Sequence, residues 1–308
     1  MKKIKNILVT SGLGFIGSHL VDKLVKKNYK VFVIDDLSTG LKKNRNTKAK
    51  YYFIDINHFI KDNKKLKKII NGKDIDVIFH LAANASVNAS LNNPNLMFQV
   101  NFNASISIIE ACKETNVKKF IFASTSAVYG EPTFLPVNES HITNPISPYG
   151  LSKLMFEEYT RYFSQSNNLS IVNFRLPNVY GKRQRPDLEG GVIAIFIDRM
   201  KENSIINIFG DGKQKRDWVH VNDIVNAFER SLKYNFDNEI ISLGSLKSNT
   251  VNKLFSILKS QLDYKKKPNY LSKRDGDIKF MIMDNKKAFK LLKWKPLIEL
   301  SKGLKLID

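Results

Sequence analysis

A glycine-rich turn between an apolar run and an amphipathic segment is the feature that most constrains the fold of this 308-residue chain. The turn, Ser11 to Gly17, follows an apolar run that starts at residue 4. The next segment, Ser18 to Lys27, has the spacing of an amphipathic helix, and a second apolar run, Val31 to Ile34, comes after it. This order predicts a strand, a helix and a parallel strand, which together form one βαβ unit.

The glycines of this turn have the spacing of a dinucleotide-binding loop. Gly12, Gly14 and Gly17 permit a tight turn, a close approach of a pyrophosphate to the backbone and close packing of the helix on the strand. Asp35 closes the second strand, where a carboxylate can accept hydrogen bonds from ribose hydroxyls. Because no arginine follows Asp35 closely, we expect the cofactor to be NAD and not NADP.

The alternation of apolar runs and helical segments continues to Arg175 and predicts an α/β fold with a doubly wound, parallel, Rossmann-type sheet. Prolines and glycine pairs then interrupt shorter elements, which indicates a smaller α/β substrate-binding lobe. We expect residues 1–175 to form the NAD-binding domain, residues 217–243 to rejoin it, and residues 176–308 to form the interleaved second lobe. The further runs that predict strands are Tyr52 to Ile54, Val77 to Leu81, Phe120 to Ala123 and Ile171 to Phe174.

Tyr149 and Lys153 form a second constellation, in which a helix would place both side chains on one face. A free tyrosine ionises near pH 10, and lowering its pKa to about 7 requires roughly 4 kcal/mol of stabilisation of the phenolate. The Lys153 ammonium and a positive nicotinamide ring could supply it, so that Tyr149 becomes a usable base. Thr125 ends a predicted strand, where it could hydrogen-bond the reacting oxygen of a substrate.

Two polar residues at strand ends have more than one interpretation. Asp55 is either an adenine contact or a turn or cap residue. His80 is better explained as a buried, hydrogen-bonded imidazole than as a catalytic one. The small residues that follow it, Leu81 to Ala83, would let a flat cofactor lie close to the backbone.

The net charge of +21 raises the question of nucleic acid binding. Lysines dominate and are scattered in pairs, which favours a solvated surface, so that no nucleic acid partner is expected. A non-enzymatic alternative is an NAD-sensing protein that binds RNA or another polyanion. Apolar runs are too short for a membrane span or a signal peptide, which predicts a cytoplasmic protein. The five histidines lie apart, so no metal site is expected, and the single cysteine, Cys112, is expected in the core.

With these motifs the chain resembles the extended short-chain dehydrogenase/reductases of the NAD-dependent epimerase/dehydratase family, and most closely the nucleotide-sugar epimerases typified by UDP-glucose 4-epimerase. The resemblance runs nearly from end to end. Two departures are Ser11, which stands where the family has glycine, and Asp275, which stands where it has proline. The stretches that carry the resemblance are the glycine turn, Asp35 to Gly40, His80 to Ala83, Ser124 to Gly130, Ser147 to Lys153, Arg175 to Gly181, Gly210 to Asp217, Arg274 to Asp277 and Trp294 to Pro296.

The resemblance implies roles for individual residues. Tyr149, Lys153 and Thr125 would be catalytic. The residues that would bind NAD are Gly12, Gly14, Phe15, Ile16, Gly17, Asp35, Asp36, Ser38, Thr39, Gly40, Asp55, Ile56, Leu81, Ala82, Ala83, Asn101, Tyr149, Lys153 and Pro177. The residues that would bind a UDP-sugar substrate are Ser86, Thr125, Ser126, Asn178, Val192, Phe209, Arg216, Arg274 and Asp277.

The implied reaction is inversion of C4 of a UDP-hexose, such as UDP-glucose or UDP-galactose, or of a UDP-N-acetylhexosamine, through a 4-keto intermediate. A nucleotide-sugar decarboxylase or 4,6-dehydratase is the alternative on the same scaffold. The dehydratases carry Asp-Glu after the threonine and the decarboxylases carry glutamate at position 127, whereas this chain has Ser126 and Ala127. The resemblance also implies a homodimer, formed through helices near residues 90–112 and 149–165.

Overall fold

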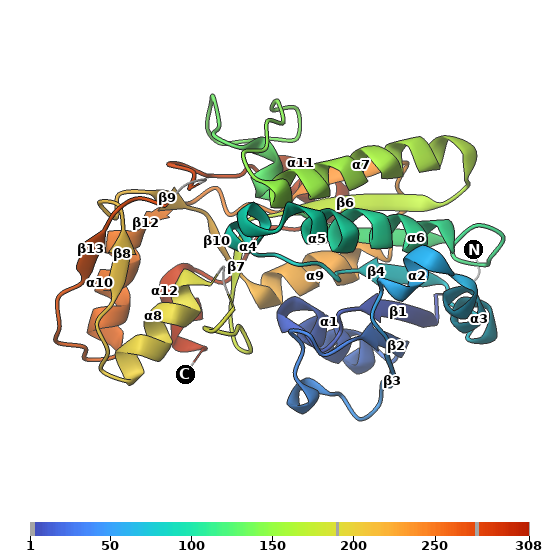
Figure 1. Ribbon diagram of the computed structural model, residues 1–308, viewed down its shortest axis with the longest axis horizontal. Coiled ribbons are helices and arrows are strands. Elements are labelled where there is room, and N and C mark those ends of the chain that lie inside the picture. The colour runs from blue at the N-terminus through green and yellow to red at the C-terminus, as the bar shows by residue number, and fades with distance from the viewer. Residues whose placement is uncertain (1–3, 189–190, 275–276, 308) are drawn as a thin grey trace.

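A seven-stranded sheet dominates the computed structural model, which describes residues 4–188, 191–274 and 277–307 (Figure 1). The strand order is β11-β6-β5-β4-β1-β2-β3, and every neighbouring pair is parallel. The predicted doubly wound parallel sheet is therefore confirmed. The strands are β1 (Asn6–Thr10), β2 (Lys30–Asp35), β3 (Lys50–Phe53), β4 (Val77–His80), β5 (Lys119–Thr125), β6 (Ser170–Leu176) and β11 (Glu239–Ser242).

Helices cover both faces of this sheet because its central strands are apolar on both sides; all four residues of β4, for example, are buried. One face packs against α1 (Phe15–Lys26), α9 (Val221–Ser231) and α11 (Lys286–Leu292). The other face packs against α2 (His58–Lys61), α3 (Lys64–Gly72), α6 (Ala104–Glu110) and α7 (Pro148–Ser166).

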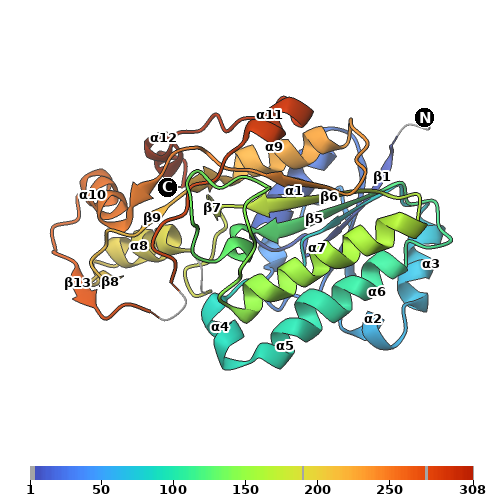
Figure 2. The ribbon, with the colours of Figure 1, turned by 90° about the horizontal axis from the view of Figure 1, so that it is seen from above.

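A smaller lobe lies beyond the carboxyl ends of β5 and β6, whose arrowheads point toward it (Figure 2). It has its own apolar core, and three two-stranded pairs lie in it or at its border with the main sheet. The pairs are β7 (Asn178–Tyr180) with β10 (Trp218–His220), β8 (Asn207–Phe209) with β13 (Asn269–Leu271), and β9 (Lys215–Arg216) with β12 (Asn249–Thr250). Its helices are α8 (Val192–Lys201), α10 (Val251–Gln261) and α12 (Leu300–Lys305).

The chain returns to the main sheet twice after residue 176. The first return supplies α9 and β11, which come from the predicted segment 217–243. The second supplies α11, which the sequence assigned to the second lobe. Ala288 and Leu292 of α11 and the following Trp294 are buried in the core that includes α9, and the Trp294 indole N–H donates to the Asp223 carbonyl at 2.8 Å. Burial of these apolar side chains holds α11 against the main sheet.

The helix expected near residues 90–112 is interrupted. Asn93 lies between α4 (Val87–Asn92) and α5 (Pro94–Phe98), and its side chain caps α5 by accepting from the Leu96 N–H. Pro94 cannot continue a helix from the preceding residue, which explains the break. A π-helical turn, Gln99–Asn103, then leads into α6. None of the helices in the described ranges is long and apolar enough to cross a membrane.

Candidate active site

The glycine turn leaves the start of α1 open to an anion. Gly14 caps the helix without a side-chain hydrogen bond, and the first helical turn contains no acidic residue. Its backbone N–H groups therefore face the space in front of the turn with a partial positive charge. A Cβ atom on Gly17 would lie 2.0 Å from the Ser11 carbonyl oxygen, so that this position requires glycine. Ser11 itself adopts a φ of 55°, in the left-handed region that glycine prefers.

Asp35 ties the turn to the end of β2. Its two carboxylate oxygens accept hydrogen bonds from the Leu13 and Leu37 N–H groups, each at 2.8 Å. Burial raises the pKa of Asp35, and these two backbone bonds oppose the rise. The loop that follows turns back sharply because Asp36 accepts from both the backbone N–H and the hydroxyl of Ser38. Thr39 and Gly40 complete this loop, and a Cβ on Gly40 would meet the Asp35 carboxylate at 2.7 Å.

Other predicted cofactor residues lie at the carboxyl ends of neighbouring strands. Asp55 follows β3 and accepts from the Asn57 N–H at 2.9 Å. This contact is of the turn type, which was one of the two interpretations of Asp55 from the sequence. Ile56 is buried beside it. Leu81, Ala82 and Ala83 follow β4, and Pro177 follows β6.

Asn101 lies in the π-helical turn and is fully buried. Its side chain accepts from the Asn84 N–H at 2.8 Å and donates to the Asn84 carbonyl at 2.9 Å and the Ser152 hydroxyl at 3.2 Å. In this conformation the residue exposes no atom to a cofactor. It links the loop after β4 to helix α7 instead, at the residue before Lys153.

His80 is a structural residue, as the sequence indicated. Thr10 Oγ1 accepts from the N–H groups of Leu81 and Ala82, so that its own proton goes to His80 Nδ1, 2.9 Å away. His80 Nε2 then donates to the Ser105 hydroxyl at 2.8 Å. Burial lowers the pKa of His80 to about 3, assisted by the charge of Lys153, and the imidazole stays neutral.

Tyr149 and Thr125 are brought together at the carboxyl end of β5. Ser147 caps α7 by accepting from the Gly150 N–H at 3.1 Å, which starts the helix immediately before Tyr149. Burial raises the pKa of Tyr149, and a hydrogen bond between the Tyr149 and Thr125 side chains opposes that rise. Thr125 is oriented further because its hydroxyl accepts from the Ala127 N–H at 3.1 Å.

Lys153 lies one helical turn after Tyr149 and is 2% exposed. Its ammonium donates to the Ala123 carbonyl at 3.0 Å and lies 4.5 Å from the centre of the Phe122 ring. The sequence predicted that the ammonium would sit beside the phenol; the structure records its hydrogen bond with β5. Burial lowers the pKa of Lys153 to about 7, and the nearby Glu157 carboxylate opposes this shift.

Each of the two arginines predicted to bind the substrate contacts another residue of the second lobe. The Arg274 guanidinium carbon lies 3.6 Å from the centre of the Phe209 ring, and Arg216 forms an ion pair with Asp277. Asp275 lies outside the described residues. The remaining predicted substrate residues are partly buried and lie between the two lobes or at the border of the second: Ser86 at the cap of α4, Ser126 after β5, Asn178 at the start of β7 and Val192 at the start of α8.

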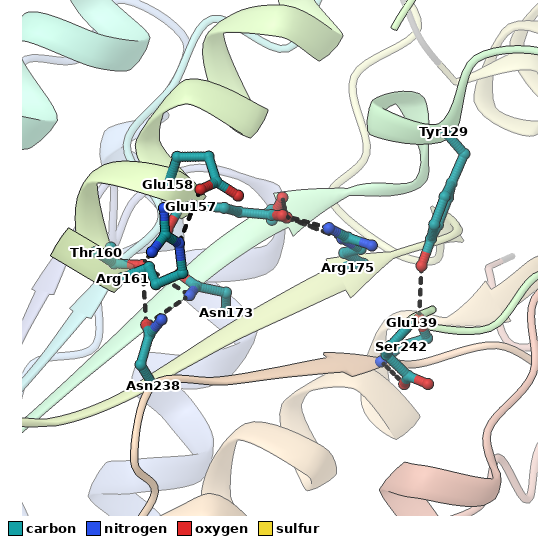
Figure 3. Close-up of polar contacts among 11 residues, drawn as sticks. Tyr129, Glu139, Glu157, Glu158, Thr160, Arg161, Asn173, Arg175, Asn238 and Ser242 are labelled. Carbon is teal, nitrogen blue, oxygen red and sulfur yellow. Dashed lines mark hydrogen bonds and ion pairs between the residues drawn. The ribbon is translucent and has the colours of Figure 1, made fainter. Parts of the chain in front are cut away.

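Glu157 and Arg175 are residues of this region that sequence reasoning missed. Glu157 lies on α7 one turn beyond Lys153, and Arg175 lies near the end of β6 (Figure 3). The pair is bidentate, with Arg175 Nη2 2.6 Å and Nε 3.2 Å from Glu157 Oε2. A glutamate at helical spacing after Lys153 was the available signal, because it puts a charge on the face of α7 that meets the sheet.

The segment 182–187 lies against α1 and the loop after β2. Arg183 pairs with Asp22 of α1 at 2.8 Å, and Arg185 Nη1 donates to the Thr39 carbonyl at 3.1 Å. His19 of α1 contacts the Lys182 carbonyl at 2.9 Å. Within the described residues, no group of three or more histidine, cysteine, aspartate or glutamate side chains is arranged to hold a metal ion.

Residues 7–244 match the model of the NAD dependent epimerase/dehydratase family. The chain belongs to this family. A Methanocaldococcus jannaschii protein, named provisionally as a UDP-glucose 4-epimerase, is 44% identical over 300 residues, which are 97% of this chain and 96% of the relative. The family resemblance inferred from the motifs is thereby confirmed.

Two solved structures place the same fold among epimerases. The UDP-glucose 4-epimerase of Thermotoga maritima, solved with UDP-glucose, has a TM-score of 0.94 and 41% identity and covers 98% of this chain and 96% of its own. The UDP-N-acetylglucosamine 4-epimerase of Methanobrevibacter ruminantium, solved with UDP-N-acetylmuramic acid, has a TM-score of 0.90 and 38% identity, with coverages of 98% and 96%. NAD is the cofactor of the family, and the uncapped start of α1 fits its pyrophosphate.

Proposed function

We propose that this protein is an NAD-dependent 4-epimerase of a UDP-hexose or a UDP-N-acetylhexosamine. The observation that carries the proposal is that Tyr149, at the start of α7, meets Thr125 at the carboxyl end of β5, the same end of the sheet at which the glycine turn lies. The epimerase relatives, which bind UDP-sugars, support it.

In this proposal the turn from Gly12 to Gly17 holds the pyrophosphate of NAD, and Asp35 accepts from the adenosine ribose. The other cofactor residues predicted from the sequence would contact NAD from the neighbouring strand ends and from the starts of α1 and α7, except that Asn101 would act through the loop after β4. The chemistry that bound NAD supplies is the acceptance and return of a hydride, together with the positive charge of its oxidised ring.

The chain's own residues move the proton. Tyr149 takes the proton of the sugar 4-hydroxyl, and the Thr125 hydroxyl hydrogen-bonds the same oxygen. Lys153 contributes positive charge, which favours the phenolate that Tyr149 must form. Because burial raises the pKa of Tyr149, this electrostatic support is needed for activity near neutral pH.

Arg216 and Arg274 are suited to bind the diphosphate, since guanidinium groups make bidentate, charge-assisted bonds with phosphates. When the substrate binds, its diphosphate would then replace Asp277 as the partner of Arg216. Phe209 offers a ring face for stacking. A homodimer, through the helices within residues 87–110 and α7, and a cytoplasmic location complete the proposal; Leu91, Leu96 and Leu151 are exposed on these helices.

Purified protein incubated with UDP-glucose, UDP-galactose and their N-acetyl forms tests the proposal. At least one pair is expected to interconvert, as resolved by chromatography or proton NMR. Absence of turnover of all four sugars, with NAD bound, would reject it. Release of carbon dioxide from a UDP-hexuronic acid, or a stable keto-sugar, would identify a decarboxylase or a dehydratase instead.

A further inference from the structure

A buried ion pair lies directly behind the residues proposed to act on the sugar. Glu157 and Arg175 have side chains that are 0% and 3% exposed. Arg175 Nε also lies 3.1 Å from Glu157 Oε1, so that the guanidinium contacts both carboxylate oxygens. A buried pair has a large desolvation cost, so that its presence is weak evidence for a stabilising role.

Glu157 joins the two elements that carry the site. It lies on α7, where Tyr149, Lys153 and Glu157 follow one another at intervals of four residues and share a face. The same carboxylate accepts a hydrogen bond from the hydroxyl of Ser124, the residue before Thr125 at the end of β5. One side chain thus connects the helix of the base with the strand of Thr125.

Arg175 extends this connection across the sheet. It is the register partner of Ser124 on β5 and of Ser242 on β11. Its guanidinium carbon lies 4.7 Å from the centre of the Tyr129 ring, in the turn that follows Thr125. Tyr129 in turn hydrogen-bonds the Ser242 hydroxyl at 3.2 Å (Figure 3). Because Arg175 is fixed on both sides, it holds the Glu157 carboxylate in one place.

The charges of this cluster favour a negative charge on Tyr149. Lys153 lies one helical turn from Tyr149 and Glu157 lies one turn farther along α7, so that Glu157 acts on Tyr149 chiefly by keeping Lys153 protonated. Removing Glu157 would weaken the hold of Lys153 on its proton, since Glu157 opposes the lowering of the Lys153 pKa by burial. The groups around Lys153 are Glu157 on α7, the neutral His80 on β4, the Phe122 ring and Ala123 carbonyl on β5, and Arg175 behind Glu157, with Tyr149 one helical turn earlier on α7.

We propose that Glu157 and Arg175 are positioning residues for the proton transfer: Glu157 aligns Thr125 with the face of α7 and holds a negative charge beside the Lys153 ammonium, and Arg175 fixes Glu157. This assignment rests on the proposed function for its consequence in turnover. The placement of the charge can be tested without any sugar.

The test is a pH titration of tyrosinate absorbance on the NAD-loaded protein, with the Tyr149→Phe protein subtracted in each background. Glu157→Gln keeps the shape and an acceptor for Ser124 but removes the charge, so that the Tyr149 titration is expected to move up by about one pH unit or more. Glu158→Gln is the matched control, because Glu158 is exposed and pairs with Arg161. It should titrate as the unaltered protein does.

Glu157→Asp separates position from charge. It keeps the charge and shortens the side chain, so that the titration is expected to stay in place while kcat for the sugar falls roughly tenfold to a hundredfold. If Glu157→Gln does not fold because Arg175 is left unpaired, the double variant Glu157→Gln with Arg175→Gln replaces it, and the same upward shift is expected.

A Glu157→Gln protein, or its double variant, that titrates like the control would overturn the proposal. So would an unaltered kcat in Glu157→Asp. If the unaltered protein converts none of the UDP-sugars, the proposed function fails, but the titration of Tyr149 still decides whether Glu157 sets the charge at this site.

Discussion

Single residues of the site combine features that the sequence shows with contacts that only the fold creates. Tyr149 and Lys153 were predictable because their spacing is helical and they follow a dinucleotide turn. The hydrogen bond of Lys153 with the Ala123 carbonyl was not, because it joins a helix to a strand 30 positions earlier in the chain. The same holds for Glu157 and Arg175, which lie 18 positions apart.

Replacement of Tyr149 by phenylalanine removes the proposed base and leaves the ring. We expect kcat for epimerisation to fall about 100-fold or more, with the unfolding free energy little changed. Tyr162→Phe is the matched control, since Tyr162 lies on the same helix and is 63% exposed. Comparable kinetics of the Tyr149→Phe and Tyr162→Phe proteins would show that Tyr149 is not the base.

Ser11→Gly relieves the left-handed backbone at the start of the turn, where φ is 55°. A residue with a Cβ atom in this region costs roughly 1 kcal/mol that glycine does not. The unfolding free energy from urea titration is therefore expected to rise by up to about 1 kcal/mol. Ser11→Ala, which keeps the Cβ atom, should not produce this gain; equal stability of the two variants would speak against strain at Ser11.

His80 makes the stability of the protein depend on pH. Its folded pKa of about 3 lies below the value of 6.5 for a free histidine, so that the unfolded chain binds a proton that the folded chain does not. Stability is therefore expected to fall as the pH drops from 6.5 toward 3, by roughly 1.4 kcal/mol per unit for one proton. In His80→Gln this slope should be shallower by about one proton. An unchanged slope of unfolding free energy against pH would disagree with a buried neutral imidazole.

At the scale of elements, the parallel strands and α1 were predictable because their apolar runs and glycine turn are local signals. The broken helix before α6 and the return of α11 to the sheet were not predicted. Asn93 and Pro94 mark the break, but the sequence was interpreted as one helical region. The position of α11 depends on the burial of Leu292 and Trp294 against α9, which is a tertiary contact without a local pattern.

The packing of α11 on the main sheet can be tested by comparing the stability effects of substitutions on its buried and its exposed face. Leu292 is fully buried and Phe289 is 52% exposed. Leu292→Ala is expected to lower the unfolding free energy by about 2–5 kcal/mol, because it leaves a cavity in the core shared with α9. Phe289→Ala should change it by no more than about 0.5 kcal/mol. Similar losses for both variants in urea unfolding would be inconsistent with α11 packed on the sheet.

For the whole molecule, the strand order brings the glycine turn, Thr125 and the Tyr149 helix to one edge of the sheet, and the second lobe stands opposite that edge. The order of motifs along the chain was enough to predict this arrangement, because parallel strands place their carboxyl ends together. The pairings of Arg216 with Asp277 and of Arg274 with Phe209 depend on how the second lobe folds and had no local signal.

The proposed homodimer makes a prediction at the same scale. Leu151 is 41% exposed on α7, and a charge there would be buried in the proposed interface. Analytical ultracentrifugation is expected to show two chains for the unaltered protein and a shift toward one chain for Leu151→Glu. Leu297→Glu, at a position that is 71% exposed and outside these helices, should remain a dimer. A single chain for the unaltered protein would refute the dimer.

In the proposed reaction, hydrogen leaves and returns to C4 of a UDP-sugar while Tyr149 exchanges the hydroxyl proton. The most direct measurement uses UDP-glucose and UDP-N-acetylglucosamine deuterated at C4, incubated with the NAD-loaded protein in ordinary water. At least one sugar is expected to be converted to its C4 epimer with the deuterium retained at C4, as read by NMR and mass spectrometry. An epimer that carries solvent hydrogen at C4, or no inversion of either sugar, would contradict it.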